Sequence, residues 1–372
     1  MTDVLLPGTT ATRVPTARTT QQVLHPDTVD PRAGGEAVLL VHGNVSSAAF
    51  WQPTMTALAE AGRPALAVDL RGYGGTDPEP VDARRGVRDW ADDVDALITA
   101  LGLERVHLVG WSMGGGVVLQ HLLDHAERVA SVTLLAPVSP YGFGGTTGAE
   151  GTLVHPDGAG SGGGAGNPDF VDAIAAGDTT ADSPTSPRSV LRAFYVAPGS
   201  LPLDPVLEDV FVASMLTTRT GPDHYPGDAV AVDAWPGIAP GGRGVLNTMA
   251  PTVLDLSGIT ELARKPPVLW VRGDADQIVS DTSAFDLAFL GSIGGVPGWP
   301  GPTAFPPQPM VTQTRAVLDR YAASGGSYRE VVFPGVGHSP QVERPAEFVA
   351  ALLEHLTAPP AAPAAEETGA SV

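Results

Sequence analysis

Short runs of apolar residues alternate with segments of helical spacing through the first third of the chain. The apolar runs are typical of strands that are buried on both faces, and they lie at 36–42, 64–70, 106–109 and 132–135. The segments between them repeat apolar side chains every three or four positions, and they lie at 49–61, 87–101 and 113–123. Strands that alternate with helices over short connections predict an α/β fold with a doubly wound, mostly parallel sheet.

The regular pattern stops near Pro137 and resumes at 267–272, with a further strand at 328–333 and helices at 311–323 and 346–356. Residues 1 to about 35 alternate polar and apolar positions, as one or two antiparallel edge strands do. An irregular stretch as long as 138–262 is uncommon inside a compact domain, so we expect an inserted, largely helical cap, with 189–196 and 206–215 as its better helices. The predicted organisation is a core domain in two parts, a cap and a Pro/Ala-rich disordered tail, with bounds 1–137, 138–262, 263–357 and 358–372.

The turn after the strand at 106–109 carries the sequence Gly110-Trp111-Ser112-Met113-Gly114, a G-x-S-x-G match. In this motif the serine lies on a strained turn between a strand and a helix, with its hydroxyl raised above the sheet. Gly110 and Gly114 are expected to provide clearance for the backbone, and Gly43 does the same in the loop after the first buried strand. Trp111 either lines a pocket or packs beneath it.

Composition limits the chemistry that the chain can perform. There is no cysteine, which excludes disulfides, thiolate metal sites and a cysteine nucleophile, and Lys265 is the only lysine, which argues against a lysine-bound cofactor. The formal net charge of −20 disfavours nucleic acid and anionic lipid as partners. No stretch approaches the roughly 18 consecutive apolar residues of a membrane span, and the first residues lack a signal-peptide pattern, so we expect a cytoplasmic protein.

An acid and a base for the serine follow the two later strands. Asp276 lies in the sequence Gly273-Asp-Ala-Asp, and His338 lies in a Gly-His-Ser-Pro sequence. A serine hydroxyl needs a base within hydrogen-bond reach, and that base needs a carboxylate to orient it. The chain order Ser, Asp, His is the order expected when the serine lies on the elbow of an α/β sheet.

With these motifs, the sequence resembles the α/β-hydrolase fold superfamily. The matching segments are LLVHGN at 39–44, DLRGYG at 69–74, GWSMGG at 110–115, VRGDADQIV at 271–279 and GVGHSPQVERPAEF at 335–348. The resemblance implies that Ser112 is the nucleophile, His338 the base and Asp276 the acid, and that the backbone N–H groups of Asn44 and Met113 form the oxyanion hole. Asp274 stays open as a substitute for Asp276.

The remaining candidate residues and motifs have structural interpretations. We expect His42 to bond loop backbone, and Asp69 and Arg71 to form a structural ion pair or to anchor turns. His121 and His125 have the i, i+4 spacing of metal ligands, but a solvated helix face is favoured and no metal site is expected. The glycine-rich tract 158–166 lacks the Lys-Ser/Thr of a phosphate loop and is expected to be a flexible linker. The cap aromatics are expected to form a small core of their own, with some lining a pocket, and they are Phe170, Phe194, Tyr195, Phe211 and Trp235.

The expected function is that of a serine hydrolase that cleaves a carboxylic ester or lactone through an acyl-enzyme on Ser112, with no cofactor. The same three residues are compatible with a C–C bond hydrolase, a perhydrolase or an acyltransferase. Dehalogenation and epoxide opening are disfavoured, because in similar families both use a carboxylate nucleophile. A non-enzymatic ligand receptor on the same fold is the alternative of a different class. The large cap favours a bulky, mostly apolar small-molecule substrate, and whether the chain forms a homo-oligomer is left open.

Overall fold

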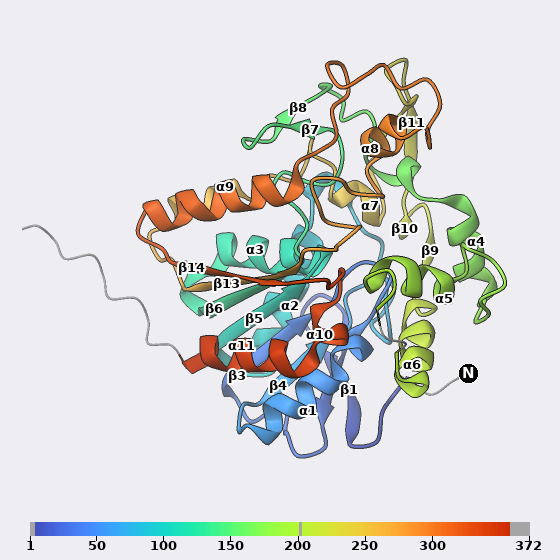
Figure 1. The fold of residues 1–372 in the computed structure, drawn as a ribbon. Helices are drawn as coiled ribbons and strands as arrows, with labels where there is room; N and C mark the ends of the chain where they lie inside the picture. Colours follow the sequence, from blue (N-terminus) through green and yellow to red (C-terminus); the bar gives the residue numbers. More distant parts are fainter. Residues whose placement is uncertain (1–3, 201–202, 358–372) are drawn as a thin grey trace, which may run out of the picture.

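The computed structural model describes residues 4–200 and 203–357, so the tail predicted at 358–372 lies outside the described residues. An eight-stranded sheet in the order β1-β2-β4-β3-β5-β6-β13-β14 forms the centre of the molecule (Figure 1). Its strands are β1 (Thr9–Pro15), β2 (Thr20–Pro26), β3 (Gly35–Val41), β4 (Ala65–Val68), β5 (Leu103–Trp111), β6 (Val129–Leu135), β13 (Val268–Gly273) and β14 (Tyr328–Phe333).

The sheet is parallel from β4 to β14, and it is antiparallel only where β1 pairs with β2 and β2 pairs with β4. Central strands such as β3 and β5 are buried on both faces, which is why their sequences are continuous apolar runs and do not alternate. In β3 and β5 Leu39 lies opposite Leu108 and Val41 opposite Gly110, so both strands end at one edge of the sheet. The structure thus confirms the predicted doubly wound, mostly parallel sheet and its antiparallel edge.

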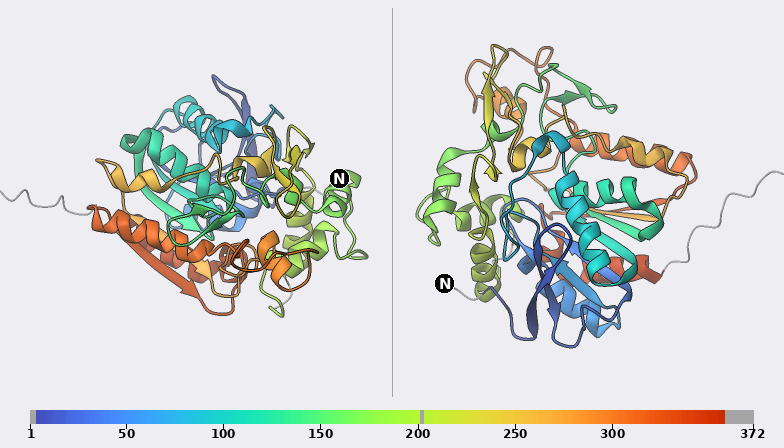
Figure 2. Two further views of the ribbon diagram at one scale, coloured as in Figure 1. Left: turned by 90° about the horizontal axis from the view of Figure 1, so that it is seen from above. Right: turned by 180° about the vertical axis from the view of Figure 1, so that it is seen from behind.

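Helices cover both faces of the sheet (Figures 1 and 2). On one face α2 (Arg88–Ala100) packs against α3 (Met113–His125), and α9 (Met310–Ala323) lies on the same side. On the other face α1 (Gln52–Glu60) packs against α11 (Pro345–Thr357). Ser47 is the N-cap of the 3₁₀ turn before α1, because its hydroxyl accepts a hydrogen bond from the backbone N–H of Ala49. The strands and helices of the two core segments therefore lie within a few residues of their predicted positions.

The chain between β6 and β13 forms the region above the carboxyl edge of the sheet (Figure 2). Its helices are α4 (Pro168–Ala176), α5 (Pro187–Val190) with the π-helical turn Leu191–Tyr195, α6 (Pro205–Met215), α7 (Val245–Thr248) and the 3₁₀ helix Ser257–Glu261. The short strands are β7 (Thr146–Thr147), β8 (Thr152–Leu153), β9 (Thr220–Gly221), β10 (Tyr225–Pro226), β11 (Ala229–Ala231) and β12 (Ile238–Pro240). The predicted helices at 189–196 and 206–215 are found, but short strand pairs and loops make up much of the rest, so "largely helical" describes only part of this region.

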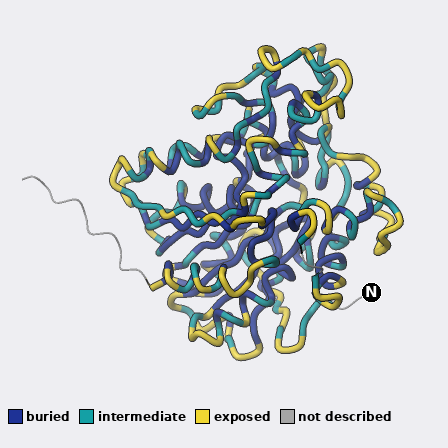
Figure 3. Tube along the Cα trace, viewed as in Figure 1, coloured by how far each residue is buried: buried dark blue, intermediate teal, exposed yellow. Residues whose placement is uncertain are grey.

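The buried side chains of this cap region belong to the same hydrophobic core as those of the sheet domain and do not form a separate core (Figure 3). Phe211 of α6 stacks on Phe50 with ring centroids 4.4 Å apart and planes at 16°. Tyr195 meets Trp111 edge-on with ring centroids 5.8 Å apart. Trp235 packs against Phe305, which belongs to another irregular stretch, at 282–308. The expectation of an independent aromatic core in the cap is therefore wrong, because Phe211, Tyr195 and Trp235 pack against residues outside it.

The stretch 282–308 carries the short helix α8 (Leu287–Ser292) and packs onto the cap region. The indole N–H of Trp235 donates to the backbone carbonyl of Pro297 at 2.9 Å. The side chain of Gln308 accepts from the backbone N–H of Gly144 and donates to the carbonyl of Gly142. The cap region (138–262) and the stretch 282–308 are two insertions that together form one continuous layer, the roof, over the carboxyl edge of the sheet.

Candidate active site

Ser112 lies between the last residue of β5 and the first residue of α3, with backbone φ 55° and ψ −121°. A non-glycine residue with positive φ is strained, and this strain lifts its side chain out of both elements. A Cβ added to Gly110 would lie 2.3 Å from the carbonyl oxygen of Gly114, and one added to Gly114 would lie 2.5 Å from that of His42. A Cβ at Gly43 would lie 2.9 Å from the Cβ of Ser112. The three motif glycines therefore allow strand, helix and loop to approach around the serine.

His338 and Asp276 meet at the ends of β14 and β13. The ring Nδ1–H of His338 donates to Oδ2 of Asp276 at 2.9 Å, and both side chains are 2% exposed. The other carboxylate oxygen, Oδ1, accepts the backbone N–H groups of Ile278 and Val279 at 2.7 and 3.0 Å. Because Nδ1 donates its proton to the carboxylate, the lone pair of the neutral tautomer lies on Nε2.

Asp274, the open substitute for Asp276, faces a different group. Its Oδ1 accepts the backbone N–H of Gly335, in the turn that precedes the histidine loop. The structure thus pairs His338 with Asp276, while Asp274 holds a turn.

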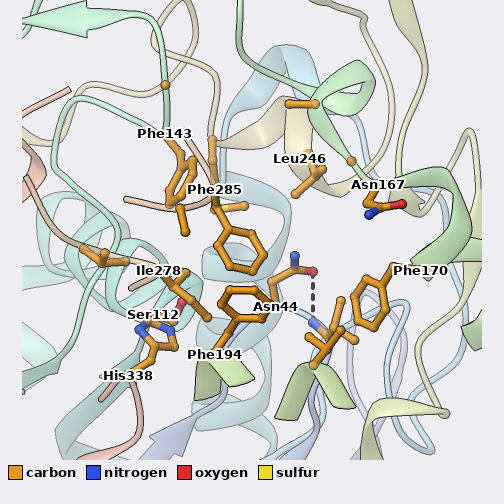
Figure 4. Close-up of a pocket in the computed structure, with 18 of the residues that line it drawn as sticks. Asn44, Ser112, Phe143, Asn167, Phe170, Phe194, Leu246, Ile278, Phe285 and His338 are labelled. Carbon is orange, nitrogen blue, oxygen red and sulfur yellow. Dashed lines mark hydrogen bonds between the residues drawn. The ribbon is translucent and has the colours of Figure 1, made fainter. Parts of the chain in front are cut away.

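Ser112 and His338 both line one cavity and lie beside each other in Figure 4. In the part of the chain that the structure describes, no hydrogen bond joins the serine hydroxyl to the ring, an arrangement that is common before a substrate is bound. The indole N–H of Trp111 donates to the backbone carbonyl of His338 at 2.9 Å, and the two rings lie 5.6 Å apart. Trp111 therefore lines the cavity and also packs beneath it, where it joins the end of β5 to the loop that carries His338.

Met113 and Asn44 are the two residues whose backbone N–H groups are expected to form the oxyanion hole. Met113 is the first residue of α3, so its N–H has no acceptor within the helix. Asn44 lies in the loop after β3 and lines the same cavity. The carbonyl of Asn44 accepts the hydroxyl of Tyr195 at 3.0 Å, which fastens this loop to the cap.

His42 holds the loop that contains Asn44. Its Nδ1 lies 2.7 Å from the carbonyl oxygen of Gly43, and its Nε2 accepts the backbone N–H of Leu70 at 3.0 Å. Burial lowers the pKa of His42 to about 4, so the ring is neutral and carries its proton on Nδ1. The expectation that His42 bonds loop backbone is confirmed.

Asp69 and Arg71 are both buried but do not pair with each other. Asp69 accepts the backbone N–H groups of Ala48 and Gly75, and burial raises its pKa to about 6 against these hydrogen bonds. The guanidinium of Arg71 binds both carboxylate oxygens of Asp93, at 2.6 and 2.8 Å. The two residues are therefore turn anchors, and the alternative of a mutual ion pair is wrong.

The cavity has a volume of about 440 Å³, and within the described ranges its lining contains one histidine, His338, and no Asp, Glu, Lys or Arg. Its walls are mostly apolar and come from the sheet edge, the cap region and the stretch after Asp276 (Figure 4). Phe170, Phe194 and Tyr195 of the cap line it, as the sequence analysis allowed for some of the cap aromatics.

The glycine-rich tract 158–166 is part of the cavity wall, so the expectation of a flexible linker is wrong. Gly160, Gly162 and Gly166 line the cavity. The backbone N–H of Gly163 donates to Oδ1 of Asn247 at 2.7 Å, and a Cβ on Gly162 would lie 2.4 Å from that oxygen. Glycine is needed here because the backbone packs directly against neighbouring segments.

His121 is fully buried, so a solvated helix face is the wrong reading for this residue. Its ring lies 5.1 Å from that of His125, and burial lowers its pKa to about 4. Among residues 4–200 and 203–357, no group of three or more His, Cys, Asp or Glu side chains is placed to hold a metal ion.

Two residues near the site had no signal in the sequence. Glu343 accepts the backbone N–H groups of Gly337 and Ala197 at 2.7 and 2.9 Å, so one carboxylate ties the histidine loop to the cap. Burial raises its pKa. Tyr225 lines the cavity from β10, in a region where no periodic pattern assigned a direction to any side chain.

Comparison with known proteins agrees with this architecture. The sequence matches the profile described as "alpha/beta hydrolase fold" over residues 36–291. RutD of Variovorax paradoxus, which carries a provisional carbamate hydrolase name, is 48% identical over 103 residues, which cover 28% of this chain and only 38% of that protein. Epoxide hydrolase A of Mycobacterium tuberculosis is 30% identical over 351 residues, covering 87% of this chain and 91% of that protein.

Among solved structures, an esterase from Exiguobacterium antarcticum superimposes with a TM-score of 0.58 at 18% identity, over 94% of this chain and 100% of that one. No helix within the described ranges is long and apolar enough to cross a membrane. The sheet order, the serine on its turn and the profile match lead to one assignment: this chain belongs to the alpha/beta hydrolase fold family.

Proposed function

We propose that the chain is a serine hydrolase that cleaves a carboxylic ester or lactone through an acyl-enzyme on Ser112. The observation that supports this most directly is the buried pair of His338 and Asp276, 2.9 Å apart, whose imidazole shares a cavity with the strained serine. The carboxylate orients the ring and leaves Nε2 free to take a proton.

In the first half-reaction, Nε2 of His338 takes the hydroxyl proton as Oγ of Ser112 bonds to the ester carbonyl carbon. The backbone N–H groups of Asn44 and Met113 donate to the oxyanion that forms. The carbon–oxygen bond to the alcohol then breaks, and the alcohol leaves with the proton from His338. Water enters and repeats the sequence, which releases the acid and restores the serine.

The chemistry at position 112 separates this proposal from epoxide opening, despite the likeness to an epoxide hydrolase. Opening an epoxide through an ester intermediate needs a carboxylate nucleophile, and this chain has a hydroxyl there. Cleavage of a carbamate carbonyl would follow the same steps as cleavage of an ester, so carbamates belong in the substrate screen.

The test is hydrolysis of para-nitrophenyl esters and of lactones of graded size by the wild type, by Ser112→Ala and by Ser292→Ala. Ser292 is exposed, and its hydroxyl only bonds a helix carbonyl, so its variant is the matched control. Ser112→Ala should lower kcat by at least about 10³-fold, and Ser292→Ala should not. A fluorophosphonate reagent should label Ser112, as read by mass spectrometry. Full turnover by Ser112→Ala, or no labelling of an active enzyme, would contradict the proposal.

A further inference from the structure

The cavity has two ends of different chemistry (Figure 4). Beside Ser112 and His338 lie three phenyl rings and a branched aliphatic side chain, from Phe143, Phe194, Phe285 and Ile278. Phe194 and Phe285 meet edge-on with ring centroids 5.0 Å apart. The other end, around Phe170 and Leu246, carries the side-chain amide of Asn167, and the side-chain amide of Asn44 lies between the two ends. An apolar group and a polar group of one ligand would therefore occupy different ends.

The amide of Asn44 has a settled orientation. Its Oδ1 accepts the backbone N–H of Val45 at 2.9 Å and the hydroxyl of Tyr73 at 2.8 Å. A backbone N–H can only donate, so the atom facing it must be the oxygen, and the –NH₂ group is the end directed into the cavity (Figure 4). Within the described residues this –NH₂ group has no acceptor.

Tyr225 contributes a second donor, and a more buried one. It lines the cavity, is 5% exposed, and its ring packs edge-on against Phe170 with centroids 6.3 Å apart. The neighbouring phenols of Tyr73 and Tyr195 donate to Asn44 and Val45, whereas the hydroxyl of Tyr225 makes no hydrogen bond within the described residues. Burial raises the pKa of Tyr225, so the phenol keeps its proton and can donate it to a ligand.

Asn167 extends the same chemistry to the rim of the cavity. Its Oδ1 accepts the backbone N–H of Asp169 as the N-cap of α4, which leaves its –NH₂ group toward the cavity (Figure 4). The part of the cavity from Asn44 to Phe170 therefore offers donors from three side chains. No arginine, lysine or acidic side chain lines the cavity within the described ranges. Donors without a cation, in a protein with a formal net charge of −20, suit an uncharged oxygen acceptor better than an anion.

We propose that the hydroxyl of Tyr225 and the side-chain amide of Asn44 form a subsite for an uncharged oxygen acceptor of the substrate, such as a ketone, amide or ether oxygen separate from the scissile carbonyl. The proposal rests on the proposed ester hydrolysis for its placement relative to Ser112. It narrows the substrate class to esters or lactones that carry a second acceptor on one side of the scissile bond and an apolar group on the other.

The first arm of the test measures turnover of two esters of equal chain length, para-nitrophenyl levulinate, whose acyl chain carries a ketone, and para-nitrophenyl valerate, which lacks it. The wild type should prefer the levulinate in kcat/KM, and Tyr225→Phe should lower that preference about three- to tenfold, the effect of one lost hydrogen bond. Tyr225→Phe removes a single oxygen and keeps the ring packing. Tyr328→Phe, whose hydroxyl bonds the exposed Asp319, is the matched control and should leave the preference unchanged.

The second arm needs no turnover. In the Ser112→Ala variant, benzylacetone and butylbenzene are titrated, and adding Tyr225→Phe should weaken binding of the ketone relative to the hydrocarbon by a similar factor. A ketone preference that depends on Tyr225 in this arm, with neither ester hydrolysed by the wild type, would support the subsite and refute the ester hydrolase. Hydrolysis of both esters with a preference that Tyr225→Phe does not change would refute the subsite and leave the hydrolase in place. The subsite would also be overturned if, in both arms, the preference for the ketone compound were the same with Tyr225 and with Tyr225→Phe.

Discussion

Gly114→Ala tests whether close packing around the serine turn sets the geometry of the site. The added Cβ would lie 2.5 Å from the carbonyl oxygens of both Val41 and His42. A normal contact between such atoms is more than about 3 Å, so α3 and the loop after β3 must separate by several tenths of an ångström. This separation would move the N–H of Met113 away from that of Asn44.

Two opposing effects set the change in the free energy of unfolding that Gly114→Ala causes. Alanine is favoured over glycine inside a helix by about 1 kcal/mol, whereas overpacking a close contact costs about 1–3 kcal/mol. We therefore expect a small net loss of stability, about 0–2 kcal/mol. The effect on catalysis should be larger, because misplacing one oxyanion donor costs about 10²–10³-fold in kcat.

The assay is urea unfolding together with ester hydrolysis at saturating substrate. Gly242→Ala is the control, because an added Cβ there meets only the side chain of Arg84, at 3.9 Å, and the residue does not need positive φ. A folded Gly114→Ala variant with the kcat of the wild type would refute the argument that this contact positions the two N–H groups.

Three further predictions concern the loop, the cap and pH. Glu343→Gln should lower kcat about tenfold with little change in KM. The carboxylate accepts two backbone N–H groups, of Gly337 and Ala197, and the –NH₂ of a glutamine would have to face one of them. Unchanged kinetics would show that this contact does not position the loop that carries His338. Phe211→Ala should cost about 3–5 kcal/mol in urea unfolding, because it removes the ring stacked on Phe50; a loss below about 1 kcal/mol would mean that the cap docks without this ring. The pKa of His42 is lowered to about 4 in the folded state, below its unfolded value of 6.5, so its contribution to stability is present above pH 6.5 and is lost as the pH falls. Through this residue the free energy of unfolding should be about 2 kcal/mol lower at pH 5 than at pH 7. An NMR titration of the folded protein that gives His42 a pKa near 6.5 would contradict this account.

The sheet domain could be predicted because its signals are local. Buried parallel strands such as β3 and β5 are continuous apolar runs, and Ser112 follows directly from β5 in the chain. Asp276 and His338 follow strands of the same sheet, so their meeting at one edge is a consequence of strand order. The proposed catalytic residues were therefore readable from short motifs placed on a regular frame.

The cap region could not be predicted in the same way, because its contacts are long-range and lack a period. Phe211 looked like part of a separate core, yet its partner Phe50 lies far back in the chain. The tract 158–166 looked flexible by composition, yet its glycines allow close packing against Asn247. His121 looked solvated, but α3 is covered on that face by α2. Composition indicates flexibility or exposure only when no distant segment fills the space.

The roof built from two insertions has a consequence for how this molecule can diversify. The side chains that would react come from the ends of sheet strands, whereas most of the cavity wall comes from the cap and from residues 278–290. Substitutions in the roof can therefore alter which molecules fit while the chemistry beneath stays intact. Selection on substrate range and selection on reaction mechanism would then act on different parts of one gene.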